Sequence, residues 1–324
     1  MDTVPHILAS AIAEAQHGRA CALCIVTSAR GSTPQVAGAM MLVRQDGSIE
    51  GTIGGGFVEA QVICDALEAS AAGTGRLATY DLTHIRGKTI GAICGGVMEI
   101  ALAPVPGAVP IDACEAALRR RTEGEDLELM FEVADGDATR RRFTLRAQPP
   151  PRLLVIGAGH CGQALANLAV TLDFDVTIID DRAELTTPGR FDPRVRTLPA
   201  DPAAALRAQL LDHRSYIAIV TRSHQQDYES LLATLSRDDQ PGYVGLIGSR
   251  RKRKMVFDDL RAAGVSDRAL DSVSSPIGID IGAQTVQEIA VSICAELIRH
   301  RRSSAAAASS VQVSEIPTTA TRPG

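Results

Sequence analysis

The stretch from residue 152 to residue 181 constrains the fold of this chain more than any other segment. Two short apolar runs flank a segment with helical spacing, and that segment begins with glycines in the pattern G-x-G-x-x-G. The glycines are Gly157, Gly159 and Gly162. A strand, a glycine turn, a helix and a second strand in this order predict a Rossmann-type unit, in which parallel strands alternate with helices.

The glycine turn is expected to bind an anion. Gly157 permits the tight turn, Gly159 lets a phosphate approach the backbone, and Gly162 lets helix and strand pack closely. The helix that follows directs unpaired N–H groups and a partial positive charge to the same place. Asp180 ends the second strand, 18 residues after Gly162, where a carboxylate accepts hydrogen bonds from ribose-like hydroxyls. The alternative is a tight turn without a ligand.

Changes in composition divide the chain into expected domains. A mixed α/β domain is predicted for residues 1–105, and a Rossmann-like, doubly wound parallel sheet for residues 152–302. Residues 106–151 are expected to hold a hairpin and a stiff proline-rich linker. From 303 to 324 the chain is rich in Ser, Ala, Thr and Pro without an apolar period, which predicts a disordered tail. The expected fold class is therefore α/β with two domains.

Composition argues against several classes of function. A net charge of -5 gives no general attraction to nucleic acid or to an anionic membrane, and the absence of Trp leaves few aromatic rings on which bases could stack. The amino terminus lacks the features of a signal peptide, and no apolar run reaches membrane-spanning length, so a cytoplasmic location is expected. The seven Cys are spaced irregularly and form no disulfide framework. Cys21 and Cys24 lie three apart in a predicted strand and point to opposite faces, which favours core packing over a metal pair.

Three adjacent glycines mark a second unusual turn. Adjacent glycines are entropically costly and are typical of backbone that bends sharply or approaches another group closely. Gly54, Gly55 and Gly56 lead directly into a helix with apolar periodicity, so an anion is expected at the helix start, with a ligand-free turn as the alternative. Glu59, in the first turn of that helix, either caps the turn or faces the ligand.

One cysteine stands apart from the others. Cys94 precedes Gly95 and Gly96, and its thiol is expected to be accessible because the glycines leave the surrounding backbone exposed. A soft sulfur donor of this kind suits a thiolate-bound metal centre, and the alternative is a structural cysteine.

Polar residues follow two later strands of the predicted sheet. Thr221-Arg222-Ser223-His224 ends one strand, and Asp227 lies just inside the next helix. Gly248 and Ser249 end another strand and precede five consecutive cations, 250–254. Ligands of open parallel sheets bind at the carboxyl ends of the strands, so these residues are expected at the binding edge. The cations would clamp a phosphate or dock an acidic partner, and the alternative is a solvated helix start.

Nine motifs occur in a fixed order along the chain. They are Arg30-Gly31-Ser32-Thr33-Pro34, Gly38-Ala39-Met40-Met41, Gly54-Gly55-Gly56-Phe57-Val58-Glu59, Cys94-Gly95-Gly96, Gly157-x-Gly159-His160-x-Gly162, Asp180-Asp181-Arg182, Thr221-Arg222-Ser223-His224-x-x-Asp227, Gly248-Ser249-Arg250-Arg251-Lys252 and Ser275-Pro276-Ile277-Gly278-x-x-Ile281-Gly282. In this order they resemble the XdhC/CoxI family over about residues 8–300.

That resemblance implies a chaperone for the molybdenum cofactor, without turnover of its own. Members of the family bind the cofactor, as molybdopterin or its cytosine dinucleotide, support its sulfurated form and deliver it to a xanthine dehydrogenase, aldehyde oxidase or CO dehydrogenase type apoenzyme. The implied partners are a second copy of the chain in a homodimer, a cysteine desulfurase and the apoprotein subunit of a molybdoenzyme.

The resemblance also implies which residues bind the cofactor. They are Arg30, Ser32, Gly54, Gly55, Gly56, Glu59, Cys94, Gly95, Gly96, Gly157, Gly159, His160, Gly162, Asp180, Thr221, Arg222, His224, Asp227, Gly248, Ser249, Arg250 and Lys252. Cys94 is expected to contact molybdenum or its sulfido ligand. The CoxI-like branch usually has Cys where this chain has Phe57, so Cys94 would act alone.

Two further hypotheses follow from single features. The glycine turn and Asp180 alone would fit an NAD(P)-dependent oxidoreductase, for which His160 and His224 are the nearby candidates for proton transfer. A nucleotide or NAD(P) in the Rossmann domain is also compatible with the chaperone hypothesis. Cys94 alone would fit a sulfur carrier that holds a persulfide, ranked as a secondary function at best.

Overall fold

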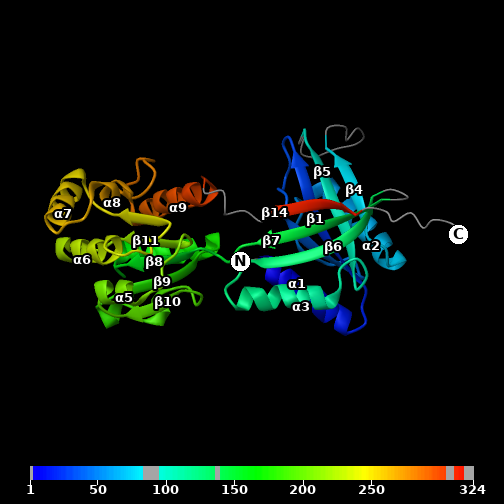
Figure 1. Cartoon of the computed structure of the whole chain (residues 1–324), viewed down its shortest axis with the longest axis horizontal. Helices are drawn as coiled ribbons and strands as arrows, with labels where there is room; N and C mark the ends of the chain where they lie inside the picture. Colours follow the sequence, from blue (N-terminus) through cyan, green and yellow to red (C-terminus); the bar gives the residue numbers. More distant parts are fainter. Residues whose placement is uncertain (1–2, 83–94, 136–138, 304–309, 317–324) are drawn as a thin grey trace. The chain divides into compact units, whose positions relative to one another are not determined.

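The computed structural model describes residues 3–82, 95–135, 139–303 and 310–316. The chain forms two compact units (Figure 1). The N-terminal unit contains residues 2–149 together with 308–324, and the Rossmann unit contains residues 150–307.

The N-terminal unit is built on an eight-stranded sheet. Its strands, in spatial order, are β14 (Ser310–Ile316), β7 (Thr139–Ala147), β6 (Leu127–Asp135), β4 (Arg76–Asp81), β5 (Val97–Val105), β1 (Cys21–Arg30), β2 (Met40–Arg44) and β3 (Ile49–Gly51). Neighbouring strands are antiparallel except β4 and β6, which are parallel and pair at Arg76 and Ala134. The sheet is therefore mixed.

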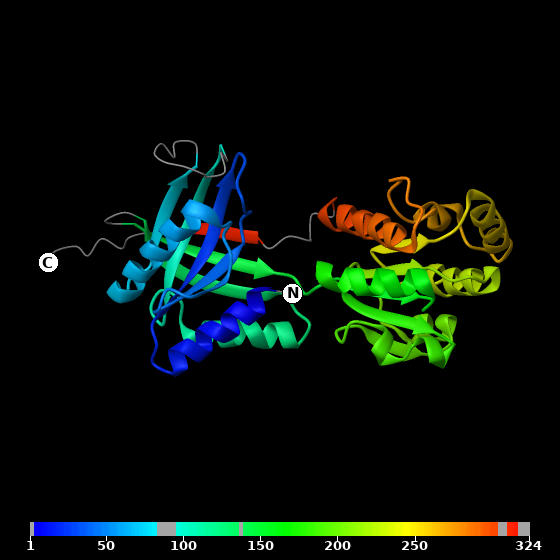
Figure 2. The same cartoon turned by 180° about the vertical axis from the view of Figure 1, so that it is seen from behind.

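Helices cover both faces of this sheet. They are α1 (Thr3–Gln16), α2 (Gly56–Ala72) and α3 (Ile111–Thr122). Helices α1 and α3 pack on one face, and α2 packs on the other (Figure 2). Strand β1 supplies both cores because its side chains alternate: Cys21 lies in the core below α1, and Cys24 lies in the core below α2. The expectation that these two thiols face opposite sides is confirmed.

Two parts of the expected domain plan differ from the structure. The hairpin of β6 and β7, expected in a segment that joins the domains, belongs to the sheet of the N-terminal unit, where Phe131 stacks on Phe143 with ring centroids 5.4 Å apart. The prediction of a disordered tail is wrong for residues 310–316, because they form β14 and pair with residues 140–146 of β7. The alternation of Val311 and Val313 in a short run suits a strand, although the surrounding Ser and Ala hide it.

The Rossmann unit contains a six-stranded parallel sheet. Its strands, in spatial order, are β10 (Arg196–Pro199), β9 (Asp175–Asp180), β8 (Arg152–Ile156), β11 (Ser215–Ile219), β12 (Tyr243–Leu246) and β13 (Val273–Ser274). Its helices are α4 (His160–Ala169), α5 (Pro202–Ala208), α6 (His224–Leu235), α7 (Arg250–Ala262), α8 (Asp267–Asp271) and α9 (Val286–Ser303), with short 3-10 helices η1 (Val170–Leu172), η2 (Ala183–Leu185) and η3 (Pro188–Arg190).

The helices of this unit form two layers around the sheet, as Figures 1 and 2 show. Helices α4 and α9 bury their apolar sides against one face, and α5, α6 and α7 cover the other. Numbered along the chain within the unit, the strands lie in the order 3-2-1-4-5-6, which is the Rossmann order. The expected fold class, a mixed α/β domain followed by a doubly wound parallel sheet, is confirmed.

Among the helices that the structure describes, none combines the length and the apolar character that crossing a bilayer requires.

Candidate functional site

The binding edge of the Rossmann unit lies where the strand order reverses, between β8 and β11. Gly157 follows β8 with a φ of 108°, and a Cβ there would lie 3.0 Å from the carbonyl oxygen of Val220, just after β11. A Cβ on Gly162 would lie 1.8 Å from the carbonyl oxygen of Gly157. Both glycines are therefore required by close backbone packing. A Cβ on Gly159 would meet nothing within 4 Å, so this part of the turn is open.

The open side of the turn carries free hydrogen-bond donors. Helix α4 begins at His160, and the first-turn N–H groups of a helix have no acceptor within it. No acidic residue lies in this first turn, and His160 is exposed. The positive end of the helix dipole is therefore available to an anion, as expected from the sequence.

Asp180 does not have the role expected from the sequence. Its side chain is 3% exposed, and its carboxylate accepts hydrogen bonds from the N–H of Ala158 at 2.7 Å and from the backbone and guanidinium of Arg182 at 2.7–2.9 Å. These bonds outweigh the cost of burial and lower the pKa of Asp180 to about 2. Because both carboxylate oxygens are already engaged, Asp180 holds the glycine turn to β9 and is not free to receive a ribose.

The next residue takes the exposed position. Asp181 has a half-exposed side chain and accepts one hydrogen bond, at 3.3 Å, from the side-chain amide of Gln226 at the start of α6. The carboxylate that can meet a hydroxyl-bearing ligand at the end of β9 is therefore that of Asp181. The sequence placed two adjacent carboxylates at the end of this strand, but it did not predict that Asp180 points inward and Asp181 outward.

An arginine distant in the sequence braces the glycine turn. The guanidinium of Arg190 donates to the carbonyl oxygens of Ala158, at 3.2 Å, and Leu185, and to the side chain of Gln163 at 3.1 Å. Gln163 in turn donates to the carbonyl oxygen of Arg190 at 2.7 Å. Sequence reasoning missed Arg190, and no local signal identifies it, because its contacts depend on the path of the chain after β9. Cys161, half-buried in the first turn of α4, was also overlooked although it lies inside the motif.

A buried ion pair links the two polar segments after β11 and β12. Asp227 is fully buried; one carboxylate oxygen accepts from the hydroxyl of Thr221 at 2.6 Å, and the other contacts the ammonium group of Lys252. Burial raises the pKa of Asp227, and the two partners oppose that shift. Thr221, Asp227 and Lys252 therefore serve one another rather than a ligand. Gly248 permits this contact, because a Cβ on it would lie 2.9 Å from the side chain of Lys252.

The remaining residues of these two segments either cap helices, contact other side chains or are exposed cations. Ser223 and Ser249 cap α6 and α7 by accepting from the N–H groups of Gln226 and Lys252. His224 contacts the carboxylate of Asp259 at 2.9 Å. The run of five cations is split, since Arg253 lies over the ring of Phe257 at 4.8 Å. Arg222 and Arg250 are exposed, and they are the expected phosphate contacts that stay open to a ligand.

Three motifs of the N-terminal unit converge at one end of its sheet. A Cβ on Gly31 would lie 2.9 Å from the carbonyl oxygen of Gly95, and one on Gly96 would lie 2.6 Å from those of Arg30 and Ser32. On the other side of this turn, a Cβ on Gly54 would lie 2.4 Å from the ring of Pro34. Segments 30–34, 54–56 and 95–96, separate in the sequence, thus form one glycine cluster. Arg30, Ser32 and Gly95 are exposed on it.

Glu59 is part of the internal structure of this cluster. Gly54, Gly55 and Gly56 all have positive φ, at 129°, 73° and 66°. The Glu59 carboxylate accepts from the hydroxyl of Thr52 at 2.5 Å and from the N–H groups of Ile53 and Gly55 at 3.2 Å. Of the two roles expected for Glu59, the structure supports the one in which it caps the turn. A carboxylate of the protein itself thus occupies the start of α2.

Cys94 lies outside the described residues, so its expected accessibility and metal contact stay predictions. Within the described ranges, no group of three or more His, Cys, Asp and Glu side chains is arranged to hold a metal ion.

These features define a class of protein: a two-unit α/β protein whose Rossmann unit has an open helix start and exposed cations at its binding edge. Comparison with known families agrees with that class and refines it. Residues 14–81 match the family described as the XdhC and CoxI family, and residues 153–297 match the XdhC Rossmann domain. The chain belongs to the XdhC and CoxI family, which confirms the resemblance seen in the motifs.

Curated relatives from bacteria are similar over most of this chain. The protein YqeB of Escherichia coli (strain K12) is 32% identical over 86% of the chain, and the chain spans 43% of the length of YqeB. A probable xanthine dehydrogenase subunit of Bacillus subtilis (strain 168) is 26% identical over 92% of the chain and 97% of its own length. The molybdenum cofactor insertion chaperone PaoD of Escherichia coli is 26% identical over 90% of the chain and 86% of its own length.

A solved structure shares the fold. The crystal structure described as a xanthine dehydrogenase (BH1974) from Bacillus halodurans superposes with a TM-score of 0.79, covering 94% of this chain and 98% of that one at 23% sequence identity. The two-unit architecture therefore occurs in an experimental structure.

Proposed function

We propose that this protein is a molybdenum-cofactor chaperone that binds the cofactor and inserts it into a xanthine dehydrogenase type apoenzyme. The observation that carries the proposal is family membership across both units, together with relatives named as an insertion chaperone and as a xanthine dehydrogenase subunit. On this proposal the chain is a maturation factor in the cytoplasm, with no turnover reaction of its own.

The binding edge of the Rossmann unit suits the phosphate end of such a cofactor. A phosphate needs hydrogen-bond donors and positive charge, and the start of α4, Arg222 and Arg250 supply both at one sheet edge. Asp181 would meet a hydroxyl of a nucleotide extension, if the cofactor is the cytosine dinucleotide. The start of α2 fits a phosphate less well, because Glu59 already places a negative charge there.

The glycine cluster suits a different part of the ligand. Arg30, Ser32 and Gly95 are exposed on it, and Gly95 is the residue that directly follows Cys94 in the sequence. A thiolate is a soft ligand for molybdenum or its sulfido group. The finer parts of the proposal are that a cysteine desulfurase sulfurates the bound cofactor, that aldehyde oxidase or CO dehydrogenase type enzymes are further clients, and that the chain acts as a homodimer.

The direct test measures molybdenum and pterin on the purified full chain from molybdenum-replete cells. Near-stoichiometric amounts of both are expected under reducing conditions, by elemental analysis for the metal and by fluorescence of the oxidised pterin. The double variant Arg222→Gln/Arg250→Gln is expected to retain less than half as much, whereas Lys254→Gln, from the same cation run, retains the wild-type amount. Protein that never takes up the cofactor, even when it is offered in vitro, would contradict the proposal.

A second function keeps one specific observation in its favour. The 3-2-1-4-5-6 strand order with its glycine turn is the arrangement of NAD(P)-dependent oxidoreductases. The proton-transfer candidates differ in environment, since His160 is exposed and His224 contacts Asp259. Titration of NADH against the protein distinguishes the two: micromolar binding with hydride transfer to an acceptor would favour the oxidoreductase, and binding without transfer would leave the nucleotide as a ligand of the chaperone.

A further inference from the structure

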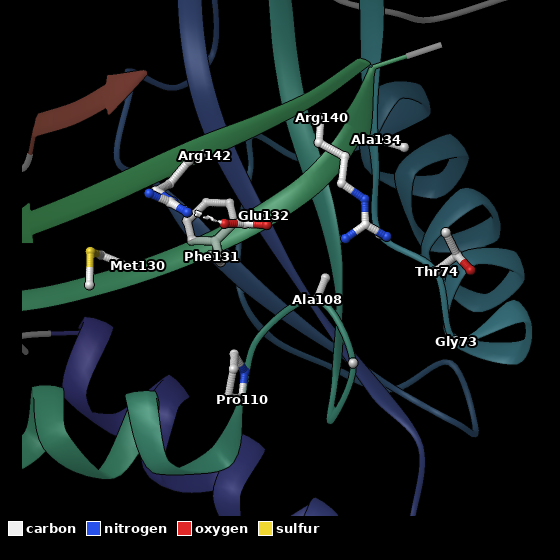
Figure 3. Close-up of a pocket in the computed structure, with 12 residues that line it drawn as sticks. Gly73, Thr74, Ala108, Pro110, Met130, Phe131, Glu132, Ala134, Arg140 and Arg142 are labelled. Atoms are coloured by element: carbon white, nitrogen blue, oxygen red, sulfur yellow. Dashed lines mark hydrogen bonds and ion pairs between the residues drawn. The ribbon is translucent and has the colours of Figure 1, made fainter. Parts of the chain in front are cut away.

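A pocket of about 620 Å³ lies in the N-terminal unit, apart from the glycine cluster (Figure 3). Two turns and two strands line it: the turn from α2 to β4, the turn from β5 to α3, and strands β6 and β7. The pocket adjoins the start of β4, just before Arg76. The glycine cluster adjoins the other end of β4, where the N–H of Leu82 donates to the carbonyl oxygen of Gly96. The two sites are therefore separated by the length of the strand.

The pocket exists because the sheet parts at this point. Strands β4 and β6 pair at a single position, and beyond it the turns take the place of β4 along the edge of β6. The carbonyl oxygen of Gly75 accepts from the N–H of Ala134 at 3.0 Å, and that of Ala108 accepts from the N–H of Glu132 at 3.4 Å. A Cβ on Gly75 would lie 2.5 Å from that of Ala108, so the turns are in contact. These backbone contacts make the hollow part of the fold.

The charge in the pocket is positive. Arg142 is neutralised by Glu132, whose carboxylate it contacts at 2.7 and 2.9 Å, as the dashed line in Figure 3 marks. Arg140 extends from β7 across β6 toward Thr74, and within the described parts of the chain its guanidinium has no hydrogen-bond or ion-pair partner (Figure 3). Among the described residues, the Arg140 guanidinium therefore has no carboxylate partner, although the protein has a net charge of -5. A guanidinium in this state matches a carboxylate or phosphate group.

Apolar side chains form another part of the lining, and the pocket is partly open. Met130 is 55% exposed although its side chain lines the pocket, and Ala108, Pro110 and Ala134 add apolar surface from three other places. The volume lies within the range of roughly 300–1,000 Å³ typical of small-molecule sites. Positive charge on one wall and apolar surface on part of the remaining lining select against both a bare inorganic ion and a neutral molecule.

We propose that this pocket binds a small organic anion, with its carboxylate or phosphate on Arg140 and its apolar body against Met130, Ala108 and Pro110. The site goes beyond the proposed function, because none of its residues belongs to the motifs that point to the cofactor.

In the test, the full chain is titrated separately with phenyl phosphate, benzoate, inorganic phosphate and benzyl alcohol, and calorimetry measures the heat of binding. Phenyl phosphate or benzoate is expected to bind with a submillimolar dissociation constant, at least tenfold tighter than inorganic phosphate or benzyl alcohol. The stronger of the two anions identifies the preferred acidic group. Arg140→Gln is expected to weaken that binding about tenfold.

The matched control is Arg146→Gln. Arg146 lies on the same strand and the same face as Arg140, pairs with Glu128 at 3.1 Å and does not line the pocket, so this variant should change the affinity less than twofold. A second variant, Ala134→Leu, places a bulky side chain in the pocket opposite Arg140 and should weaken binding while the circular dichroism spectrum stays unchanged. Equal binding by wild type and Arg140→Gln, equal affinity for inorganic phosphate, or no binding of either organic anion at 5 mM overturns the proposal.

Discussion

The two glycine turns that begin α2 and α4 have similar sequences and different uses. At α2, Glu59 of the first helical turn accepts from the N–H groups of Ile53 and Gly55, so a carboxylate of the protein lies at the helix start. At α4 the first turn has no acid, and the neighbouring Asp180 accepts from Ala158, before the helix begins. In the α4 turn, Asp180 therefore holds the backbone in place, and no carboxylate of the protein lies at the first N–H groups of the helix.

A glycine pattern alone therefore does not mark a ligand site. In both turns glycine is required by a close contact: Gly54 lies against the ring of Pro34, and Gly162 lies against the backbone of Gly157. What separates a structural turn from an anion site is where the nearest carboxylate of the protein lies. Substitutions at these two turns test this distinction.

The largest effect is expected for Gly162→Ala. A methyl group would lie 1.8 Å from a backbone oxygen that cannot move without distorting the turn, so the free energy of unfolding of the Rossmann unit should fall by ~3 kcal/mol or more. Gly159→Ala is the control, since φ is -67° there and no atom lies within 4 Å; it should cost less than ~1 kcal/mol. Urea unfolding followed by circular dichroism measures both, and equal midpoints would contradict the packing argument.

The next effect is expected for Asp180→Asn. Loss of the buried charge removes charged hydrogen bonds to Ala158 and Arg182 and should lower the free energy of unfolding by about 2 kcal/mol at pH 7. Asp181→Asn, at the exposed neighbour, should change it by less than ~0.5 kcal/mol. If the two substitutions had equal effects, Asp180 would not be the residue that holds the turn.

The same pair gives a pH dependence with a definite sign. The pKa of Asp180 falls from 3.8 to about 2 on folding, so its contribution is present above the unfolded value and is lost as the pH decreases from about 4 to about 2. The difference in stability between wild type and Asp180→Asn should therefore shrink across that window. A difference that persists unchanged at pH 2 would rule out ionisation as its source.

A smaller effect is expected for Glu59→Gln. The side chain keeps its shape but loses the charge that accepts from Thr52, Ile53 and Gly55, so about 1 kcal/mol of stability should be lost from the N-terminal unit. Glu68→Gln, an exposed position on the same helix, should cost less than ~0.5 kcal/mol. If Glu59→Gln instead leaves stability unchanged and alters ligand binding, Glu59 faces the ligand after all.

The smallest effect is expected for Arg222→Gln. This exposed cation should contribute about 0.5 kcal/mol to binding of inorganic pyrophosphate at the α4 turn, a two- to threefold change in affinity that is screened by salt. Calorimetry at low and high ionic strength measures it, with Lys254→Gln as the control. An effect that is the same at both ionic strengths would mean that Arg222 acts by shape and not by charge.

The sequence predicted what depends on local order along the chain. The Rossmann fold follows from a strand, a glycine turn and a helix within thirty residues, and the facing of Cys21 and Cys24 follows from strand alternation. Contacts across long separations were not predictable. Strand β6 joins the N-terminal sheet through one parallel pair with β4, and no sequence pattern in either strand predicts this pairing.

For the candidate site in the Rossmann unit, the sequence predicted the edge of the sheet but not the contacts that each side chain makes. The motif residues that end or follow β8, β9, β11 and β12 lie at the carboxyl edge of the sheet, because topology brings the ends of parallel strands together. Their individual roles depended on side-chain pairing, which placed Asp180 on Arg182 and Asp227 on Lys252 and left Asp181, Arg222 and Arg250 exposed.

The return of the chain to form β14 makes the Rossmann unit an inserted domain, tethered at both ends. Its two attachment points lie at one edge: β8 starts at Arg152, and at the far end of α9 His300 contacts Tyr216, near the start of the neighbouring β11. Both tethers thus leave from the amino edge, and the opposite edge, with the glycine turn, carries neither. When the Rossmann unit unfolds, pairing of β14 with β7 closes a flexible loop of more than 150 residues. The entropy cost of closing that loop then opposes the pairing, so the stability of β14 in the N-terminal unit depends on whether the Rossmann unit is folded.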